Sequence, residues 1–298
     1  MTVLVTGGTG FVGKRLQLKK PEWVYVSSKD YDLSSVEECV KMYKEVRPEA
    51  VVHLAGKVGG IKTNNENPAD FYYLNTMINT NVVHQAYEHG VKRVLASLST
   101  CVFPDVVKNY PLKEEDLFSG PPSATNLSYG YAKRSLLIQI NAYRKQYDLD
   151  YSTFCPSNIY GPEDNFDLYS SHFVPALIRK CVEIDENKEI ELWGDGKALR
   201  QQLYVDDLVG IIPLLLEQHH TNIPMIVAPS ENLSILEMFE MLLKQIGENI
   251  KVKFNKELPG QYRKDGSNKK LLNLIGEYNF TPFEEGVRKT YEWYRQNK

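Results

Sequence analysis

The fold is decided by the stretch Val3-Leu4-Val5-Thr6-Gly7-Gly8-Thr9-Gly10-Phe11-Val12-Gly13. Its apolar and β-branched beginning predicts a buried strand, and its glycines come where that strand turns into a helix. Gly7, Gly10 and Gly13 form Gly-x-x-Gly-x-x-Gly, while Gly8, Gly10 and Gly13 satisfy the looser Gly-x-Gly-x-x-Gly. Without Cβ atoms, such a turn lets a pyrophosphate approach backbone N–H groups at a helix start. The stretch predicts a dinucleotide-binding turn; the alternative is a glycine-rich turn that binds nothing.

Short β-rich runs alternate with helical patterns through the first half of the chain. The helical stretches 68–90 and 128–147 are long enough to cross a sheet. Ser34 followed by Glu37 predicts a capping box at a helix start, and Arg47-Pro48 predicts that helix's end. The predicted strands are Val3–Thr6, Val24–Ser27, Val51–Leu54, Val94–Ser99 and Tyr151–Cys155. This alternation is typical of an α/β fold with a Rossmann-type, doubly wound parallel sheet.

The rhythm changes after about residue 160, where prolines interrupt the chain at positions 156, 162 and 175. We therefore expect residues 1–160 to form the cofactor-binding Rossmann domain. Residues 161–298 are expected to form mainly a smaller, mixed α/β substrate-binding lobe. Segments around 200–230 look like a helix and a strand of the main sheet, so they are expected to return to the first domain.

Composition excludes several classes of protein. The chain has 298 residues, of which 42% are hydrophobic and 24% charged, with a formal net charge of −3. These values are ordinary for a globular protein and give no electrostatic reason to expect nucleic acid as a partner. No apolar run is long enough to cross a bilayer, and no signal peptide is seen, so we expect a cytoplasmic protein with no membrane partner. The four cysteines lack metal-binding spacing, so we expect no metal.

The residues after the second predicted strand choose between NAD and NADP. A carboxylate there hydrogen-bonds the free ribose hydroxyl but repels a 2′-phosphate. Ser27, Ser28 and Lys29 instead supply hydroxyls and a cation, which favours NADP(H). Asp30 and Asp32 follow closely and keep NAD as the alternative. A further alternative is that Ser27 to Lys29 form a solvated turn that binds no cofactor.

Tyr129 and Lys133 lie four residues apart in a predicted helix, so their side chains share one face. We expect the lysine ammonium to lower the phenol pKa toward the working range for acid–base catalysis. By itself Tyr-x-x-x-Lys is a weak pattern. Ser99 strengthens it, because it ends the fourth predicted strand, at the edge where open α/β sheets hold ligands.

With these motifs in place, the chain resembles the extended short-chain dehydrogenases/reductases, and within them the 3,5-epimerase/4-reductases of GDP-4-keto-6-deoxy-D-mannose. The resemblance runs nearly end to end. The motifs that carry it are Thr6 to Gly13, His53-Leu54-Ala55, Lys57-Val58-Gly59-Gly60-Ile61, Leu98-Ser99-Thr100-Cys101-Val102-Phe103-Pro104, Tyr129 to Lys133, Asn158-Ile159-Tyr160-Gly161-Pro162-Glu163-Asp164-Asn165-Phe166 and Ser171-His172-Phe173-Val174-Pro175-Ala176-Leu177.

The resemblance implies one pocket that catalyses two reactions and yields GDP-L-fucose. Cys101 and His172 are the implied acid–base pair that inverts C3 and C5, whose protons the C4 ketone acidifies. NADPH then reduces C4, Tyr129 supplies the proton, Lys133 supports the tyrosine and the cofactor ribose, and Ser99 orients the oxygen. The alternatives are another NAD(P)-dependent sugar-nucleotide epimerase or dehydratase, or a catalytically idle NADP-binding regulator.

The resemblance also assigns binding residues and a homodimer formed through 68–90 and 128–147. For the nucleotide sugar, Trp193 offers a flat apolar face and Arg200 a cation for the diphosphate, with Lys180 and Lys264 as further cations. The chain departs from the family pattern at Gly56, where alanine is common, and at Pro259, where an aspartate often stands. In addition to the glycines, Ser27 to Lys29, Tyr129 and Lys133, the resemblance assigns further residues to the cofactor: Phe11, Val12, Asp32, Leu33, Leu54, Ala55, Leu98, Pro156, Asn158, Ile159 and His172.

Overall fold

A computed structural model of the protein describes residues 1–255 and 261–298. Its main layer is a six-stranded sheet in which each neighbouring pair is parallel. Across the sheet the strands are β2 (Val24–Val26), β1 (Val3–Thr6), β3 (Ala50–His53), β4 (Arg93–Ser97), β5 (Asp150–Pro156) and β10 (Met225–Val227). The strand order reverses between β1 and β3, which is the point where doubly wound sheets bind ligands. The predicted fold class is confirmed.

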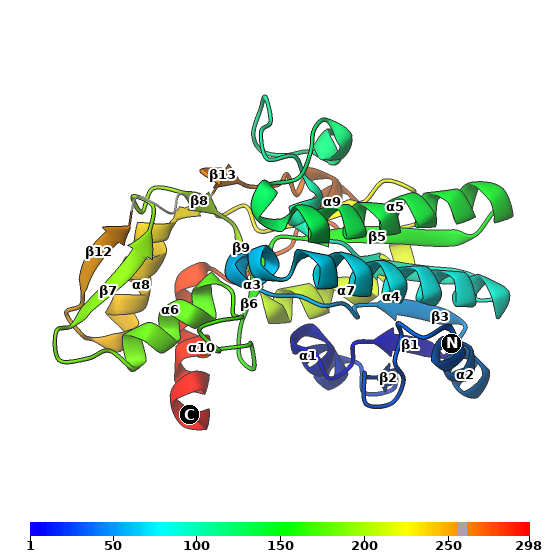
Figure 1. The fold of residues 1–298 in the computed structure, drawn as a ribbon, viewed down its shortest axis with the longest axis horizontal. Coiled ribbons are helices and arrows are strands. Elements are labelled where there is room, and N and C mark those ends of the chain that lie inside the picture. The colour runs from blue at the N-terminus through cyan, green and yellow to red at the C-terminus, as the bar shows by residue number, and fades with distance from the viewer. Residues whose placement is uncertain (256–260) are drawn as a thin grey trace.

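Helices cover both faces of this sheet (Figure 1). One face is covered by α2 (Val36–Val46), α4 (Pro68–Glu88) and α5 (Leu127–Tyr147), and the other by α1 (Phe11–Lys19), α7 (Val205–Gln218) and α9 (Lys269–Ile275). A separate apolar core lies between the sheet and each helical layer. The strands are therefore buried on both faces, as near-continuous apolar runs require.

The start of α2 differs from the prediction by one residue. Ser35, not Ser34, is the N-cap, and its hydroxyl accepts a hydrogen bond from the Glu38 N–H at 3.2 Å. Ser34 instead donates its own N–H to the Asp32 carboxylate at 2.9 Å, because this short aspartate side chain closes a local turn. The helix ends as predicted at Arg47, which adopts a left-handed conformation before Pro48.

A smaller lobe packs beside the carboxyl ends of the strands and appears on the left in Figure 1. Its own apolar core includes Leu177, Phe239 and Phe283. The lobe's helices are α6 (Phe173–Val182), α8 (Ile235–Ile246) and α10 (Phe283–Asn297). Its strand pairs and small sheet are β6 (Asn158–Tyr160) with β9 (Gln202–Tyr204), β7 (Glu189–Trp193) with β12 (Lys251–Asn255), and β8 (Leu199–Arg200) between β11 (Leu233–Ser234) and β13 (Arg263–Lys264).

The chain crosses between the two parts more than once. Helix α7 packs against α1, and β10 joins the main sheet with Met225 opposite Phe154. Helix α9 also packs against β10, a second return that the sequence analysis did not predict. Among the described residues, no helix is long and apolar enough to span a bilayer.

Candidate active site

The glycine turn is built for close approach of a ligand to the backbone. Gly7 has φ +77°, and a Cβ there would lie 2.9 Å from the Ala55 nitrogen. A Cβ on Gly13 would lie 2.3 Å from the Gly7 carbonyl oxygen. Gly10 is the N-cap of α1 and provides no capping side chain, so the first N–H groups of that helix remain for an anion. These features fit the pyrophosphate of a dinucleotide.

Most residues assigned to the cofactor lie at one edge of the sheet, where strands and the first turn of α1 end or begin. Leu54 and Ala55 follow β3, and Leu98 follows β4. Two assignments are less open to a ligand, because Leu33 is buried in the core under α2 and Asp32 is engaged in its local turn. The remaining members of this edge are Phe11, Val12, Pro156, Asn158 and Ile159.

Of the three residues expected to bind NADP in the turn after β2, Ser27 is engaged in hydrogen bonds within the turn itself. The Ser27 hydroxyl and N–H both donate to the Asp30 carboxylate, at 2.7 and 2.8 Å. These hydrogen bonds, with the charge of Lys29, lower the pKa of Asp30. Ser28 and Lys29 stay exposed. A hydroxyl and a cation therefore remain available for a 2′-phosphate, while Asp30 is held against Ser27.

Ser99, Tyr129 and Lys133 come together where β4 ends beside α5. Tyr129 is buried, hydrogen-bonds Ser99 and packs edge-on against the Phe71 ring. Lys133 is buried as well, and its Nζ donates to the Ser97 carbonyl oxygen at 2.9 Å. The structure thus assembles the serine, tyrosine and lysine that the sequence singled out.

The electrostatics of this group correct one expectation. The Tyr129 pKa is raised rather than lowered, because burial disfavours the phenolate and outweighs the hydrogen bond from Ser99. Burial also lowers the pKa of Lys133 to about 8. Sequence spacing cannot reveal this, since it shows the lysine charge but not the loss of water. Tyr129 is consequently held as a neutral phenol, a form that can donate a proton.

A buried polar chain that the sequence analysis missed lies behind Lys133. The Ala55 N–H reaches Thr6 Oγ1 at 3.3 Å, and Thr6 Oγ1 lies 2.7 Å from His53 Nδ1. His53 Nε2 lies 3.0 Å from Asn79 Oδ1. Because amide Oδ1 accepts, Nε2 carries the proton and Nδ1 accepts from threonine. Burial, with the Lys133 charge, lowers the pKa of His53 to about 3, so the imidazole is neutral.

Cys101 lies directly beside Ser99, which caps the short 3₁₀ turn Thr100–Val102 by accepting from the Cys101 N–H at 3.2 Å. Two side chains donate to its sulfur: Asn126 Nδ2 at 2.9 Å and Lys264 Nζ at 3.4 Å. Asn126 carried no signal in the sequence analysis. Cys39, Cys155 and Cys181 are buried free thiols.

His172 stands at the N-cap of α6, and its side chain makes no capping hydrogen bond. The residue is exposed, but partial desolvation by neighbouring groups and, to a smaller extent, the positive charge of Lys264 lower the imidazole pKa. The preceding loop is tied to the segment that follows β3, since the Gly60 N–H donates to the Ser170 carbonyl at 3.0 Å. A Cβ on Gly60 would lie 2.6 Å from the Ser171 carbonyl oxygen, so glycine permits this contact.

The four residues assigned to the nucleotide sugar come from different elements of the lobe. Lys264 pairs with Arg200 in the parallel register of β13 and β8, so the two residues are neighbours on adjacent strands. The Arg200 guanidinium donates to the Leu199 and Gln261 carbonyl oxygens, at 2.7 and 2.5 Å. Trp193 is 43% exposed at the end of β7, and Lys180 is half-buried on α6. Pro259 lies outside the described residues.

Gly56 has a local explanation in the structure. A Cβ there would lie 2.8 Å from Asn75 Oδ1 and 3.6 Å from Lys133 Nζ. Asn75 Oδ1 is already fixed, because it accepts from the Lys57 N–H at 3.1 Å. Glycine therefore makes room for this buried asparagine beside Lys133.

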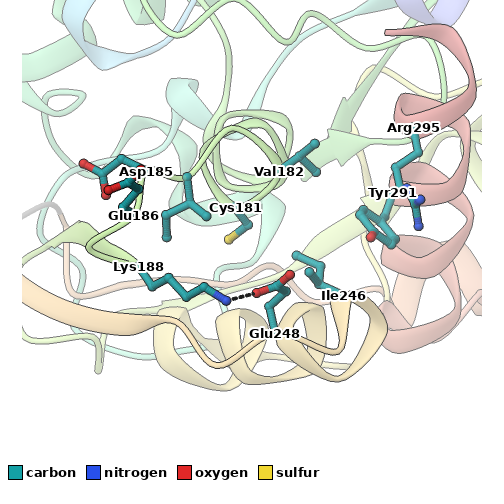
Figure 2. A pocket seen from close by; sticks show the side chains of 10 residues that line it. Cys181, Val182, Asp185, Glu186, Lys188, Ile246, Glu248, Tyr291 and Arg295 are labelled. Carbon is teal, nitrogen blue, oxygen red and sulfur yellow. Dashed lines mark hydrogen bonds and ion pairs between the residues drawn. The ribbon is translucent and has the colours of Figure 1, made fainter.

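A hollow of about 470 Å³ in the smaller lobe contains none of the residues assigned to the site (Figure 2). Its wall includes Cys181, Tyr291 and the ion pair between Lys188 and Glu248, whose atoms lie 2.6 Å apart. Within residues 1–255 and 261–298, no group of three or more His, Cys, Asp or Glu side chains could hold a metal ion. The candidate chemistry is therefore concentrated around Ser99, Cys101 and Tyr129.

A parallel doubly wound sheet, a glycine turn at its switch point and a Ser-Tyr-Lys group define a class of nicotinamide-dependent oxidoreductases. The model of the NAD dependent epimerase/dehydratase family matches residues 3–227. The chain belongs to this family.

Within this family, the chain is similar to proteins with more specific names. The chain is 34% identical to a GDP-L-fucose synthase of Dictyostelium discoideum, over 99% of this chain and 96% of that protein. It is 35% identical to a probable GDP-L-fucose synthase of Drosophila melanogaster, over 99% and 97%. A GDP-L-fucose synthetase from Naegleria fowleri bound to NADP matches with a TM-score of 0.91 and 33% identity, covering 99% of this chain and 93% of that one.

Proposed function

We propose that this protein is an NADPH-dependent 3,5-epimerase/4-reductase that converts GDP-4-keto-6-deoxy-D-mannose to GDP-L-fucose. The observation that carries the proposal is that the residues proposed for the reduction and those proposed for the epimerisation are in direct contact. Ser99, which hydrogen-bonds Tyr129, also accepts from the backbone of Cys101. Tyr129, which is proposed for the reduction, and Cys101, which is proposed for the epimerisation, thus both contact Ser99. Full-length similarity to GDP-L-fucose synthases supports the same conclusion.

The cofactor domain is proposed to be residues 1–160, with the returning segments around 200–230. When NADPH is bound, it supplies the hydride for C4 of the sugar. Gly7, Gly10 and Gly13 would receive the pyrophosphate at the start of α1, while Ser28 and Lys29 would meet the 2′-phosphate. Phe11, Val12, Leu54, Ala55, Leu98, Pro156, Asn158 and Ile159 would line the same edge of the sheet. Asp32, Leu33 and His172, which lie away from that edge, complete the proposed cofactor residues.

In the reduction, Tyr129 is proposed to donate the proton to the C4 oxygen. Its raised pKa keeps the phenol protonated until negative charge develops on that oxygen. Ser99 orients the oxygen through its hydroxyl. Lys133, fixed by the Ser97 carbonyl and carrying a pKa of about 8, is charged at pH 7 and stabilises negative charge nearby.

In the epimerisation, Cys101 and His172 are proposed to act on the carbon atoms flanking the ketone. One removes a proton from C3 or C5, leaving an enolate whose electrons rest on the C4 oxygen, and the other returns a proton to the opposite face. The Ser99 and Tyr129 hydroxyls that face this oxygen stabilise the enolate. The same oxygen site therefore supports both reactions.

The smaller lobe, 161–298 apart from its returning segments, is proposed to bind the nucleotide sugar. Arg200 and Lys264 offer adjacent positive charge for the diphosphate, and Trp193 offers an exposed aromatic face. Lys180 on α6 is the fourth proposed ligand.

A homodimer through α4 and α5 is also proposed. These two helices pack side by side and carry exposed apolar side chains, namely Tyr72, Tyr73, Tyr131 and Ile138. Exposed apolar side chains on two neighbouring helices are typical of a surface that a second copy covers. The free thiols of all four cysteines suit a reducing compartment, which supports a cytoplasmic location.

The test is NADPH absorbance after addition of freshly prepared GDP-4-keto-6-deoxy-D-mannose, with the sugar product identified by NMR. NADPH oxidation with formation of GDP-L-fucose is expected. Reduction without inversion of C3 and C5 would contradict the epimerase half of the proposal. Bound NADPH with no oxidation would contradict the whole assignment and favour another sugar nucleotide or an idle binding protein.

A further inference from the structure

Two donors from distant parts of the chain converge on the sulfur of Cys101. Asn126 Nδ2 lies 2.9 Å from Sγ and Lys264 Nζ lies 3.4 Å from it. Hydrogen bonds donated to a sulfur stabilise negative charge that develops on it, so these two donors suit a sulfur that takes part in proton transfer. One of the donors is a cation, which adds direct attraction.

Lys264 is held in this position by backbone contacts on both sides. It lies on β13, which pairs with β8. The segment is also fastened to the loop that follows Cys101: the Leu112 N–H donates to the Asp265 carbonyl at 2.8 Å, and the Tyr110 hydroxyl donates to the Arg263 carbonyl at 2.9 Å. The ammonium therefore reaches the sulfur from a fixed strand and not from a free loop.

The same charge acts on the second member of the acid–base pair. Lys264 is one of the two causes that lower the pKa of His172. Two other titratable groups that interact electrostatically with Cys101 are Tyr129 and Cys155, whose pKa values are raised chiefly by burial. Both are therefore neutral near pH 7, so Lys264 is the cation whose contact with Cys101 the structure describes.

We propose that Lys264 is a positioning residue for epimerisation, which, together with Asn126, fixes the Cys101 sulfur by hydrogen bonds and stabilises negative charge on it during proton transfer. This inference rests on the proposed function of the pocket. It gives Lys264 a role at the reacting carbons beyond the diphosphate contact considered above. Cys101 thiolate takes the carbon-bound proton and becomes a thiol, while the C–H electrons form the enolate. The protonated form of His172, which is a minor form near pH 7 but a stronger acid because its pKa is lowered, then returns a proton to carbon and becomes neutral.

The first test needs no substrate. Iodoacetamide reacts with thiolate, and Cys39, Cys155 and Cys181 are buried, so alkylation of the native protein reports on Cys101. Mass spectrometry identifies the alkylated residue, and Cys101→Ser supplies the blank. Lys264→Met is expected to slow alkylation at pH 7 about tenfold and to move the pH profile upward by about one unit, which Lys264→Arg largely restores.

Lys269→Met is the matched control, because it removes an equal charge from an exposed lysine five residues further along the chain. Its alkylation rate should equal that of the wild type. Equal rates and profiles for Lys264→Met and the wild type would overturn the proposal. So would equal slowing in Lys264→Met and Lys269→Met, because the effect would then reflect net charge and not contact with the sulfur.

The second test measures solvent deuterium incorporation at C3 and C5 of the sugar. Lys264→Met should slow incorporation about tenfold while NADPH affinity is unchanged, and incorporation at the wild-type rate would overturn the proposal. The two assays separate the two ideas. A wild-type protein that fails to process the sugar but shows the predicted alkylation profile would contradict the proposed function and retain the contact of Lys264 with the thiolate.

Discussion

The neutral, buried imidazole of His53 predicts a specific loss of stability in acid. Its pKa in the folded protein is about 3, against an ordinary value of 6.5. Below pH 6.5 the unfolded chain takes up a proton at this position, whereas the folded chain does not do so until about pH 3. Acid therefore favours the unfolded state throughout this window, and the stability contributed by neutral His53 is fully present only above pH 6.5.

The magnitude follows from the pH interval used. Between pH 7 and pH 5, about 1.5 pH units lie below the unfolded pKa, and each unit is worth about 1.4 kcal/mol. His53 should then lower the free energy of unfolding by about 2 kcal/mol. His219, buried with a pKa of about 4, adds a loss in the same direction. Asp164 opposes both, because burial raises its pKa to about 7 and the folded state takes up its proton in this range.

Comparison with His53→Gln isolates the His53 contribution. Glutamine has no imidazole to protonate, and the effects of His219 and Asp164 are common to both proteins and cancel in the difference. Urea unfolding at pH 7 and pH 5 should give a wild-type loss about 2 kcal/mol larger than the loss in the variant. Equal losses would refute the reasoning. Should the variant be too unstable for a folded baseline, His219→Gln is expected to remove a similar pH-dependent loss of about 2 kcal/mol.

Three substitutions test the proposed chemistry directly. Tyr129→Phe should slow NADPH oxidation by about 100-fold or more and still permit deuterium exchange at C3 or C5; stopped-flow absorbance showing an unchanged rate would contradict its role as proton donor. Cys101→Ser should suppress exchange at these carbons with nearly unchanged NADPH affinity, and weakened cofactor binding in a fluorescence titration would argue against a dedicated acid–base role. Gly13→Ala should weaken NADPH binding by at least about tenfold, because its Cβ would meet the Gly7 carbonyl at 2.3 Å and displace the turn; wild-type affinity would show that the turn adapts.

Local patterns were sufficient for the sheet and for part of the site. The β-rich runs at Val3 and Val94 predicted strands because their side chains are buried on both faces of a parallel sheet. Tyr129 and Lys133 were recognisable because four-residue spacing on a helix is a property of the chain itself. The glycine turn could be predicted for the same reason, since the spacing of its glycines at the end of β1 is local, although the atoms that exclude a Cβ at Gly7 belong to Ala55.

Contacts made by tertiary packing could not be predicted in this way. Asn126 is 25 positions from Cys101 and Lys264 is 163 positions away, so no sequence spacing connects these donors with the sulfur. The predicted direction of the Tyr129 pKa shift was wrong, because the sequence shows the charge of Lys133 but does not show that Tyr129 is buried. The helix cap moved from Ser34 to Ser35 because Asp32 competes for the Ser34 N–H, a choice between two equally ordinary turns.

The interleaved path of the chain restricts how such proteins can exchange parts during evolution. The family match ends at Val227, where β10 completes the main sheet. The core of the smaller lobe is nevertheless shared across that point, because Tyr160 packs against Phe283 and Val174 joins the same core as Val287. A chain ending at Val227 would leave this apolar surface open and prone to aggregation. Recombination between relatives would therefore need to transfer together the two stretches that build the lobe, one before α7 and one after β10, while the segment from α7 to β10 between them is retained.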